Sequence, residues 1–107
     1  MSLDISLHAV RPTEIYSLNI THNLNNMAEE AGIYKHLWRP EELGITKASG
    51  LIEPLRAGLE LLLAEPARFK TFNPPNGWGD YEWLCEAVNA YLRACVCNAD
   101  ADVRVSR

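Results

Sequence analysis

Long hydrophobic runs, clusters of basic residues and the common catalytic motifs are all missing from this sequence. Its longest apolar run, LELLLA, is interrupted by Glu60 and is far shorter than a membrane-spanning helix. Lysine and arginine total 10, with no three in succession, and the formal net charge is −4. Because nucleic-acid binding depends on basic patches that neutralise phosphates, the sequence argues against a nucleic-acid partner. The same charge balance argues against binding to an anionic membrane surface.

Signatures of catalysis and of metal binding are equally scarce. The G-x-S-x-G nucleophile elbow and both glycine-rich phosphate loops are absent. The three cysteines, Cys85, Cys95 and Cys97, have the spacing C-x9-C-x-C, which fits no common zinc pattern. Acid pairs such as Glu41 and Glu42 are adjacent, so on a helix they point apart and form no converging pair. We therefore expect no metal and no cofactor, and an enzyme is not the favoured interpretation.

The size of the chain and its first residues set further expectations. With 107 residues, of which 48% are apolar and 22% charged, the chain has the size and composition of one globular domain, 1–107. Its opening, MSLDISLHAV, carries Asp4 and lacks the basic segment and apolar stretch of a signal peptide. We therefore expect a cytoplasmic protein.

Apolar and polar residues alternate in three segments, 3–10, 14–21 and 101–107. A period of two predicts half-buried β-strands, and Pro12 separates the first two. Helical spacing of apolar residues follows in 24–31, 48–63 and 81–95. Asp80 is the predicted N-cap of the last helix. Pro54 lies within the middle stretch and predicts a kink there, because proline removes one backbone hydrogen bond.

The order of the predicted elements, β-β-α-α-α-β, indicates an α+β fold. We expect a small, single-layer, mostly antiparallel sheet, covered on one face by three main helices, with the last strand beside one of the first two. The opposite face would be polar, presenting His8, Ser17, Asn19, Thr21, Arg104 and Ser106. Such a face is either simply solvated or a surface that binds something.

One group of polar candidates stands where the second strand gives way to a helix. It contains Asn19, Thr21, His22 and Asn23. A helix N-terminus offers free N–H groups to a phosphate or carboxylate, and asparagine amides can read a nucleobase edge or a sugar hydroxyl. His22 could bind phosphate or transfer protons near neutral pH. The alternative is a capping cluster, with Thr21 or Asn23 as the N-cap.

A second group of candidates combines tryptophan with polar neighbours. In HLWRP, Trp38 could stack on a planar ligand and Arg39 could hold a phosphate, unless they are a core tryptophan and a surface arginine. In NPPNGWGD, Asn73, Asn76 and Trp78 lie in a proline- and glycine-rich loop. Such a rigid loop with an aromatic side chain is typical of recognition, although Trp78 could instead cover the edge of the core.

Several segments together resemble a family of small bacteriophage and prophage proteins of uncharacterised activity. They are NITHNL, MAEEAGIY, LWRPEELGI, LIEPLRAGLELL, FNPPNGWGDYEWL and the closing DVRVSR. The resemblance covers nearly the whole chain and implies a phage origin and a cytoplasmic location, but it transfers no active site. Small phage proteins without enzyme motifs often act by binding. One class sequesters nucleotide messengers of bacterial immunity as symmetric oligomers.

Our leading hypothesis is a non-enzymatic protein that binds a small polar, nucleotide-like ligand and forms a homo-oligomer. Arg39 and the helix N-terminus would hold phosphate, the asparagines would read base or ribose, and Trp38 or Trp78 would stack. One alternative is a phage protein that inhibits a host protein through its surface. Another is a small hydrolase that uses His22 as a base.

Overall fold

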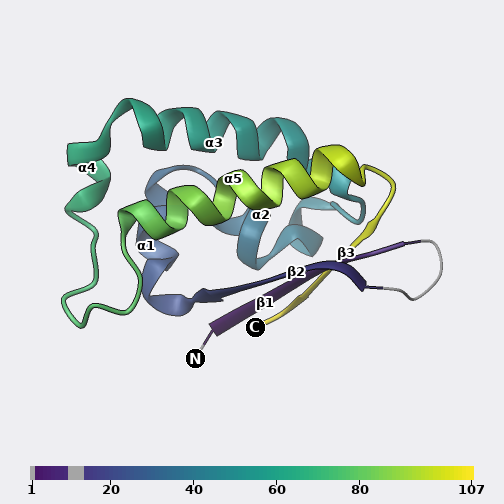
Figure 1. Ribbon diagram of the computed structural model, residues 1–107, viewed down its shortest axis with the longest axis horizontal. Helices are drawn as coiled ribbons and strands as arrows, with labels where there is room; N and C mark the ends of the chain where they lie inside the picture. The colour runs from purple at the N-terminus through teal and green to yellow at the C-terminus, as the bar shows by residue number, and fades with distance from the viewer. Residues whose placement is uncertain (1, 10–13) are drawn as a thin grey trace.

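The computed structural model describes residues 2–9 and 14–107, in which a three-stranded antiparallel sheet is covered by helices on one face (Figure 1). The strands are β1 (Ser2–His8), β2 (Glu14–Thr21) and β3 (Asp102–Ser106). Their order is β2-β1-β3, so the first strand lies in the centre and the last strand returns beside it. The predicted α+β fold is confirmed. Position 10 of the first predicted strand lies outside the described residues, and so does Pro12, which was predicted to separate the first two strands.

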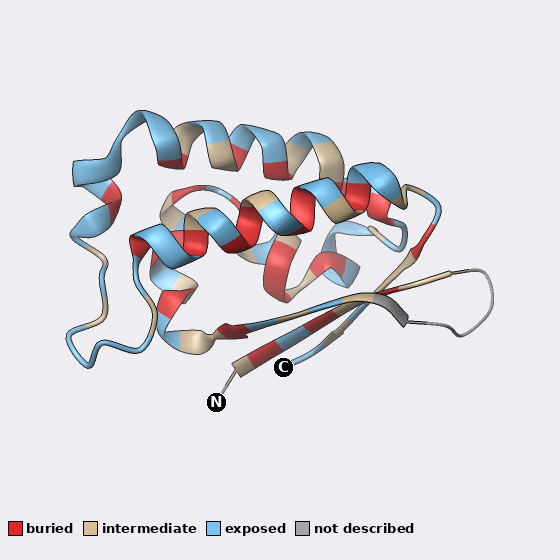
Figure 2. Cartoon of the chain, in the orientation of Figure 1, coloured by how far each residue is buried: buried red, intermediate tan, exposed pale blue. Residues whose placement is uncertain are grey.

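The pairing register separates an apolar face from a polar face. Ile5 lies between Leu18 and Val105, and Leu3 pairs with Ile20. Because side chains alternate between faces, these residues point towards the helices, where Leu3, Ile5 and Ile20 are buried (Figure 2). The neighbouring row faces the other way and consists of Asn19, Asp4 and Ser106. No helix covers this open face in Figure 1.

The helical elements follow the sequence patterns closely. In chain order they are η1 (His22–Leu24), α1 (Asn25–Glu30), α2 (Tyr34–Trp38), η2 (Pro40–Leu43), η3 (Ala48–Leu51), α3 (Ile52–Ala64), α4 (Pro66–Lys70) and α5 (Tyr81–Cys97). The long helices α3 and α5 pack on each other. Helix α5 begins as predicted, because the Asp80 side chain accepts a hydrogen bond from the backbone N–H of Trp83 at 2.8 Å.

The predicted kink at Pro54 is wrong. Helix α3 begins at Ile52, after the 3-10 turn η3, so Pro54 lies in its first turn. Backbone N–H groups in the first turn of a helix have no partner within the helix, and a proline there removes no hydrogen bond. The apolar spacing runs through the 3-10 turn and the helix without a break, which is why the sequence suggested one longer helix.

The two outer edges of the sheet differ. At β3, the backbone N–H of Val103 donates to the carbonyl of Thr46 at 2.9 Å, and Lys47 forms a bridge with Asp102. The outer edge of β2 has no hydrogen-bonded neighbour within residues 2–9 and 14–107. In the described part of the chain, the β3 edge of the sheet is therefore covered and the β2 edge is open.

Candidate functional site

Four of the predicted site residues meet at one end of the sheet. Together with Ser2, the side chains of Asn19, Thr21, Asn23 and Trp78 line a hollow of about 420 Å³, which we call the Trp78 hollow. It lies where β1 begins and β2 ends, and the loop between α4 and α5 supplies the tryptophan. The fold thus brings together residues that are far apart in the sequence.

Close packing at Gly79 positions the tryptophan loop. A Cβ atom at this glycine would lie 2.9 Å from both Cγ2 of Thr21 and Cδ1 of Leu24, and its φ is +88°. Both conditions favour glycine, so the loop can rest directly on the turn that follows β2. The side-chain oxygen of Asn76 accepts a hydrogen bond from the backbone N–H of Trp78 at 3.0 Å and shapes the turn. The indole of Trp78 is 68% exposed and therefore free to contact a ligand.

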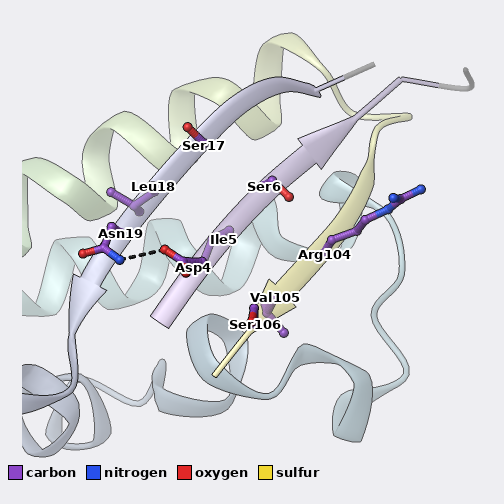
Figure 3. Close-up of a pocket in the computed structure, with 9 residues that line it drawn as sticks. All are labelled: Asp4, Ile5, Ser6, Ser17, Leu18, Asn19, Arg104, Val105 and Ser106. Carbon is purple, nitrogen blue, oxygen red and sulfur yellow. Dashed lines mark hydrogen bonds between the residues drawn. The ribbon is translucent and has the colours of Figure 1, made fainter. Parts of the chain in front are cut away.

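The amide of Asn19 is held in one orientation. Its Nδ2 donates to Oγ of Ser2 at 2.8 Å and to Oδ1 of Asp4 at 2.7 Å, the second of which Figure 3 shows as a dashed line. A flipped amide would place its oxygen against the Asp4 carboxylate, which repels it. The Oδ1 atom of Asn19 is therefore turned away from Asp4 and is available to accept a hydrogen bond.

Two exposed hydrogen-bond acceptors stand at this end of the sheet. They are Oδ1 of Asn19, which is turned away from Asp4, and the carboxylate of Asp4 itself, and both residues are exposed. The hydroxyl of Thr21 already accepts from the backbone N–H of Asn23 at 3.4 Å. The arrangement suits a ligand with N–H or O–H donors, and the charge of Asp4 disfavours an anion in direct contact with it.

A second, smaller hollow of about 340 Å³ continues from Asn19 across the open face, and we call it the sheet hollow. Its lining consists of Asp4, Ile5, Ser6, Ser17, Leu18, Asn19, Arg104, Val105 and Ser106 (Figure 3). The serines are short and leave the space empty. In Figure 3 the Arg104 side chain extends from β3 away from Asn19. Asn19 belongs to both hollows and joins them.

The prediction that Trp38 could stack on a ligand is corrected by the structure. This side chain is 3% exposed and stacks on Tyr34, with ring centroids 5.4 Å apart. The ring of His22 lies against Trp38 at 6.1 Å between centroids, and its Nε2 is buried without a hydrogen-bond partner among the described residues. Trp38 is thus a core residue, and neither it nor His22 lines the Trp78 hollow.

The predicted phosphate clamp of Arg39 and a helix N-terminus is also corrected. Nη1 of Arg39 donates to Oε2 of Glu42 at 3.0 Å, and Arg39 does not line either hollow. The chain after β2 forms a three-residue 3-10 turn. The Thr21 hydroxyl accepts a hydrogen bond from the backbone N–H of Asn23, which is therefore not available to an anion. The capping interpretation of Thr21 therefore describes this turn better than an anion site does.

Asn73 has a structural role in this arrangement. Its side-chain oxygen accepts from the backbone N–H of Tyr81 at 2.8 Å, which supports the start of α5. It does not line the Trp78 hollow. Asn76 acts on the site indirectly, through the turn that carries Trp78.

Two residues at the site were missing from the sequence-based candidates. Ser2 and Asp4 hold the Asn19 amide, and both come from the central strand. The alternating pattern does place Asp4 on the polar face. Only the pairing register, in which Asp4 lies opposite Asn19, shows that the two side chains meet.

Within residues 2–9 and 14–107, no group of three or more histidine, cysteine or acidic side chains is arranged to hold a metal ion. No helix in this part of the chain is both long and apolar enough to cross a membrane. Comparisons with protein-family models, with curated proteins and with solved structures gave no match to this chain.

Proposed function

We propose that the protein binds a small polar ligand with a planar ring, of the nucleoside or nucleotide type, in the Trp78 hollow. The observation that carries the proposal is the pairing of an exposed indole with an amide of fixed orientation in one hollow. Stacking of a planar ring on the indole face stabilises a complex. An amide of fixed orientation selects a ring or sugar whose N–H or O–H groups can donate to its oxygen.

In this arrangement, the ring would stack on Trp78. Its amino groups, or the hydroxyls of an attached ribose, would donate to Oδ1 of Asn19 and to the Asp4 carboxylate. A phosphate would point away from Asp4, out of the hollow, because two negative charges repel each other. The site would thus recognise mainly the nucleoside part of a nucleotide.

The lining favours binding over turnover. Amide, hydroxyl and indole groups line the hollow, and none of them is a strong nucleophile or base at neutral pH. The carboxylate of Asp4, beside the hollow, accepts a hydrogen bond from the Asn19 amide and serves to orient it. Together with the resemblance to small phage proteins, this supports a role in sequestering a nucleotide messenger of bacterial immunity.

A thermal-shift panel tests the proposal, using nucleosides, nucleoside monophosphates, cyclic nucleotides and NAD-derived nucleotides. A ligand at a hundred times its Kd would add about 2.7 kcal/mol to the free energy of unfolding and raise Tm measurably. Trp78→Ala and Asn19→Ala should each abolish the shift. Leu63→Ala is the matched control, because Leu63 is 59% exposed on α3 and lies away from the hollow.

Failure of the whole panel, or a shift that survives in both variants, would contradict the proposal. A host protein retained stoichiometrically from lysate, with no small molecule bound, would favour inhibition of a host protein instead. Turnover of a bound compound, lost in His22→Ala, would favour the hydrolase.

A further inference from the structure

The outer edge of β2 has the features of a pairing surface. Its described side chains, from Tyr16 to Thr21, include no charge and no proline. Edge strands are usually protected by lysine, proline, a bulge or a covering segment, because their free N–H and C=O groups otherwise pair with another strand. Within the described residues, no such segment hydrogen-bonds to this edge.

The edge of β3, in contrast to that of β2, is covered by another segment of the chain. Thr46 and Lys47 cover the β3 edge through a backbone hydrogen bond, a β-bridge and an ion pair between Lys47 and Asp102 with 2.5 Å between Nζ and Oδ1. Beyond β3, the Arg107 side chain donates to the carbonyl of Trp38 at 2.8 Å. Among the residues that the structure describes, the chain thus covers the β3 edge of its sheet and leaves the longer edge strand, β2, without a neighbour on its outer side.

The helix above β2 extends this uncharged surface. Tyr16 of β2 stacks on Tyr91 of α5, with ring centroids 5.9 Å apart, and Figure 3 shows α5 behind β2. Beside Tyr91, on the flank away from α3, helical spacing aligns Trp83, Ala87, Ala90 and Ala94. Ala90 is exposed and Trp83 is 37% exposed. The small side chains let another helix approach closely.

We infer that β2 pairs with β2 of a second copy of this chain, antiparallel and about a two-fold axis. Antiparallel pairing of identical strands is self-complementary, so each edge supplies the partner that the other needs. The two three-stranded sheets become one of six strands, and the Ala90 flanks of the two α5 helices meet. The net charge of −4 makes two copies repel each other, but the stretch from Tyr16 to Thr21 and the Ala90 flank of α5 carry no charge. Glu14, the first residue of β2, is the one charged residue of this strand.

Dimerisation through β2 does not depend on the ligand proposal, but it determines how the two ligand hollows are arranged. Both open faces lie on the same side of the joined sheet. Asn19 and Thr21 belong to the end of β2, so antiparallel pairing places the two Trp78 hollows at opposite ends of the paired strands. A second strand of foreign origin would extend the sheet but would leave the alanine flank of α5 uncovered.

Native mass spectrometry and light scattering of the full chain test the inference. One chain has a mass of 12.0 kDa, and we expect twice that value at micromolar concentration. Ala90→Glu and Ser17→Lys each add two like charges to the proposed interface, one from each copy, and we expect each to raise the dimer dissociation constant at least tenfold. Ala57→Glu, at an exposed position of α3, should leave the dimer intact.

Circular dichroism establishes that each variant folds. If Ala90→Glu does not fold, Ser17→Lys and amide exchange in the wild-type protein test the inference without it. In the wild type, amide exchange in β2 should accelerate on dilution into the monomer range, while that of β1 should not. A monomer at high micromolar concentration would overturn the inference. So would a dimer that both variants leave unchanged, or β2 exchange that does not respond to dilution.

Discussion

Gly79→Ala should destabilise the protein and open its site. The added Cβ would lie 2.9 Å from Thr21 and from Leu24, the second of which is fully buried. A residue with a side chain at φ +88° also costs about 1–2 kcal/mol. Overpacking against the core adds about 1–3 kcal/mol. We therefore expect a loss of about 2–5 kcal/mol in the free energy of unfolding.

The neighbouring glycine provides the control. Gly77 has a φ of +75°, but an added Cβ there meets nothing within 4 Å. Gly77→Ala should cost only the backbone term, about 1–2 kcal/mol. Urea unfolding at equilibrium measures both values, and the midpoint should shift while the slope m is unchanged.

The difference between the two variants isolates the contact that seats the tryptophan loop. Gly79→Ala should also weaken any ligand-induced rise in Tm, because Trp78 moves with the loop, whereas Gly77→Ala should weaken it less. Equal losses of stability in the two variants would refute the reasoning, since they would show that Gly79 does not rest on the turn after β2.

Three further predictions concern stability, pH and thiol reactivity. The hydroxyl of Tyr81 donates to the backbone carbonyl of Leu62 in α3 at 2.6 Å. Tyr81→Phe should therefore lower the free energy of unfolding, measured in urea, by about 0.5–1.5 kcal/mol. An unchanged free energy would show that water replaces this hydrogen bond. The hydrogen bond from Lys47 lowers the pKa of Asp102 in the folded protein. The ionised Asp102 therefore stabilises the fold at any pH above the ordinary carboxyl pKa, and this stabilisation is lost as the pH falls through the lowered pKa of the folded state. On acidification, the Tm of Asp102→Asn should therefore fall less than the Tm of the wild type. Parallel plots of Tm against pH for the two proteins would contradict this prediction. Cys97 is exposed, whereas burial raises the pKa of Cys95 to about 12. Iodoacetamide at pH 8 followed by peptide mass mapping should label Cys97 in the folded protein, and Cys95 only after denaturation.

The sequence predicted the elements well because local spacing decides them. Alternation marked all three strands, and Asp80 marked the start of α5 through a hydrogen bond that depends on neighbouring residues alone. The error at Pro54 has the same origin. Apolar spacing does not distinguish a 3-10 turn from the first turn of an α-helix, so the true start at Ile52 was hidden.

The site was only partly predictable, because its assembly depends on contacts between distant segments. Asn19 was a candidate from its place on the polar row, but its partner Asp4 emerges only from the strand register. The position of Trp78 follows from the packing of Gly79 on Thr21. For Trp38, residue type suggested stacking on a ligand, whereas the fold buries it.

Two-dimensional NMR of the isotope-labelled protein tests the central claim most directly, through titration with the four nucleoside monophosphates. The account predicts that at least one of them shifts the side-chain amide signals of Asn19 and the indole N–H signal of Trp78 together, with smaller changes around Arg39 and Glu42. Unchanged Asn19 and Trp78 signals across the whole series, or shifts that centre on Arg39, would contradict it.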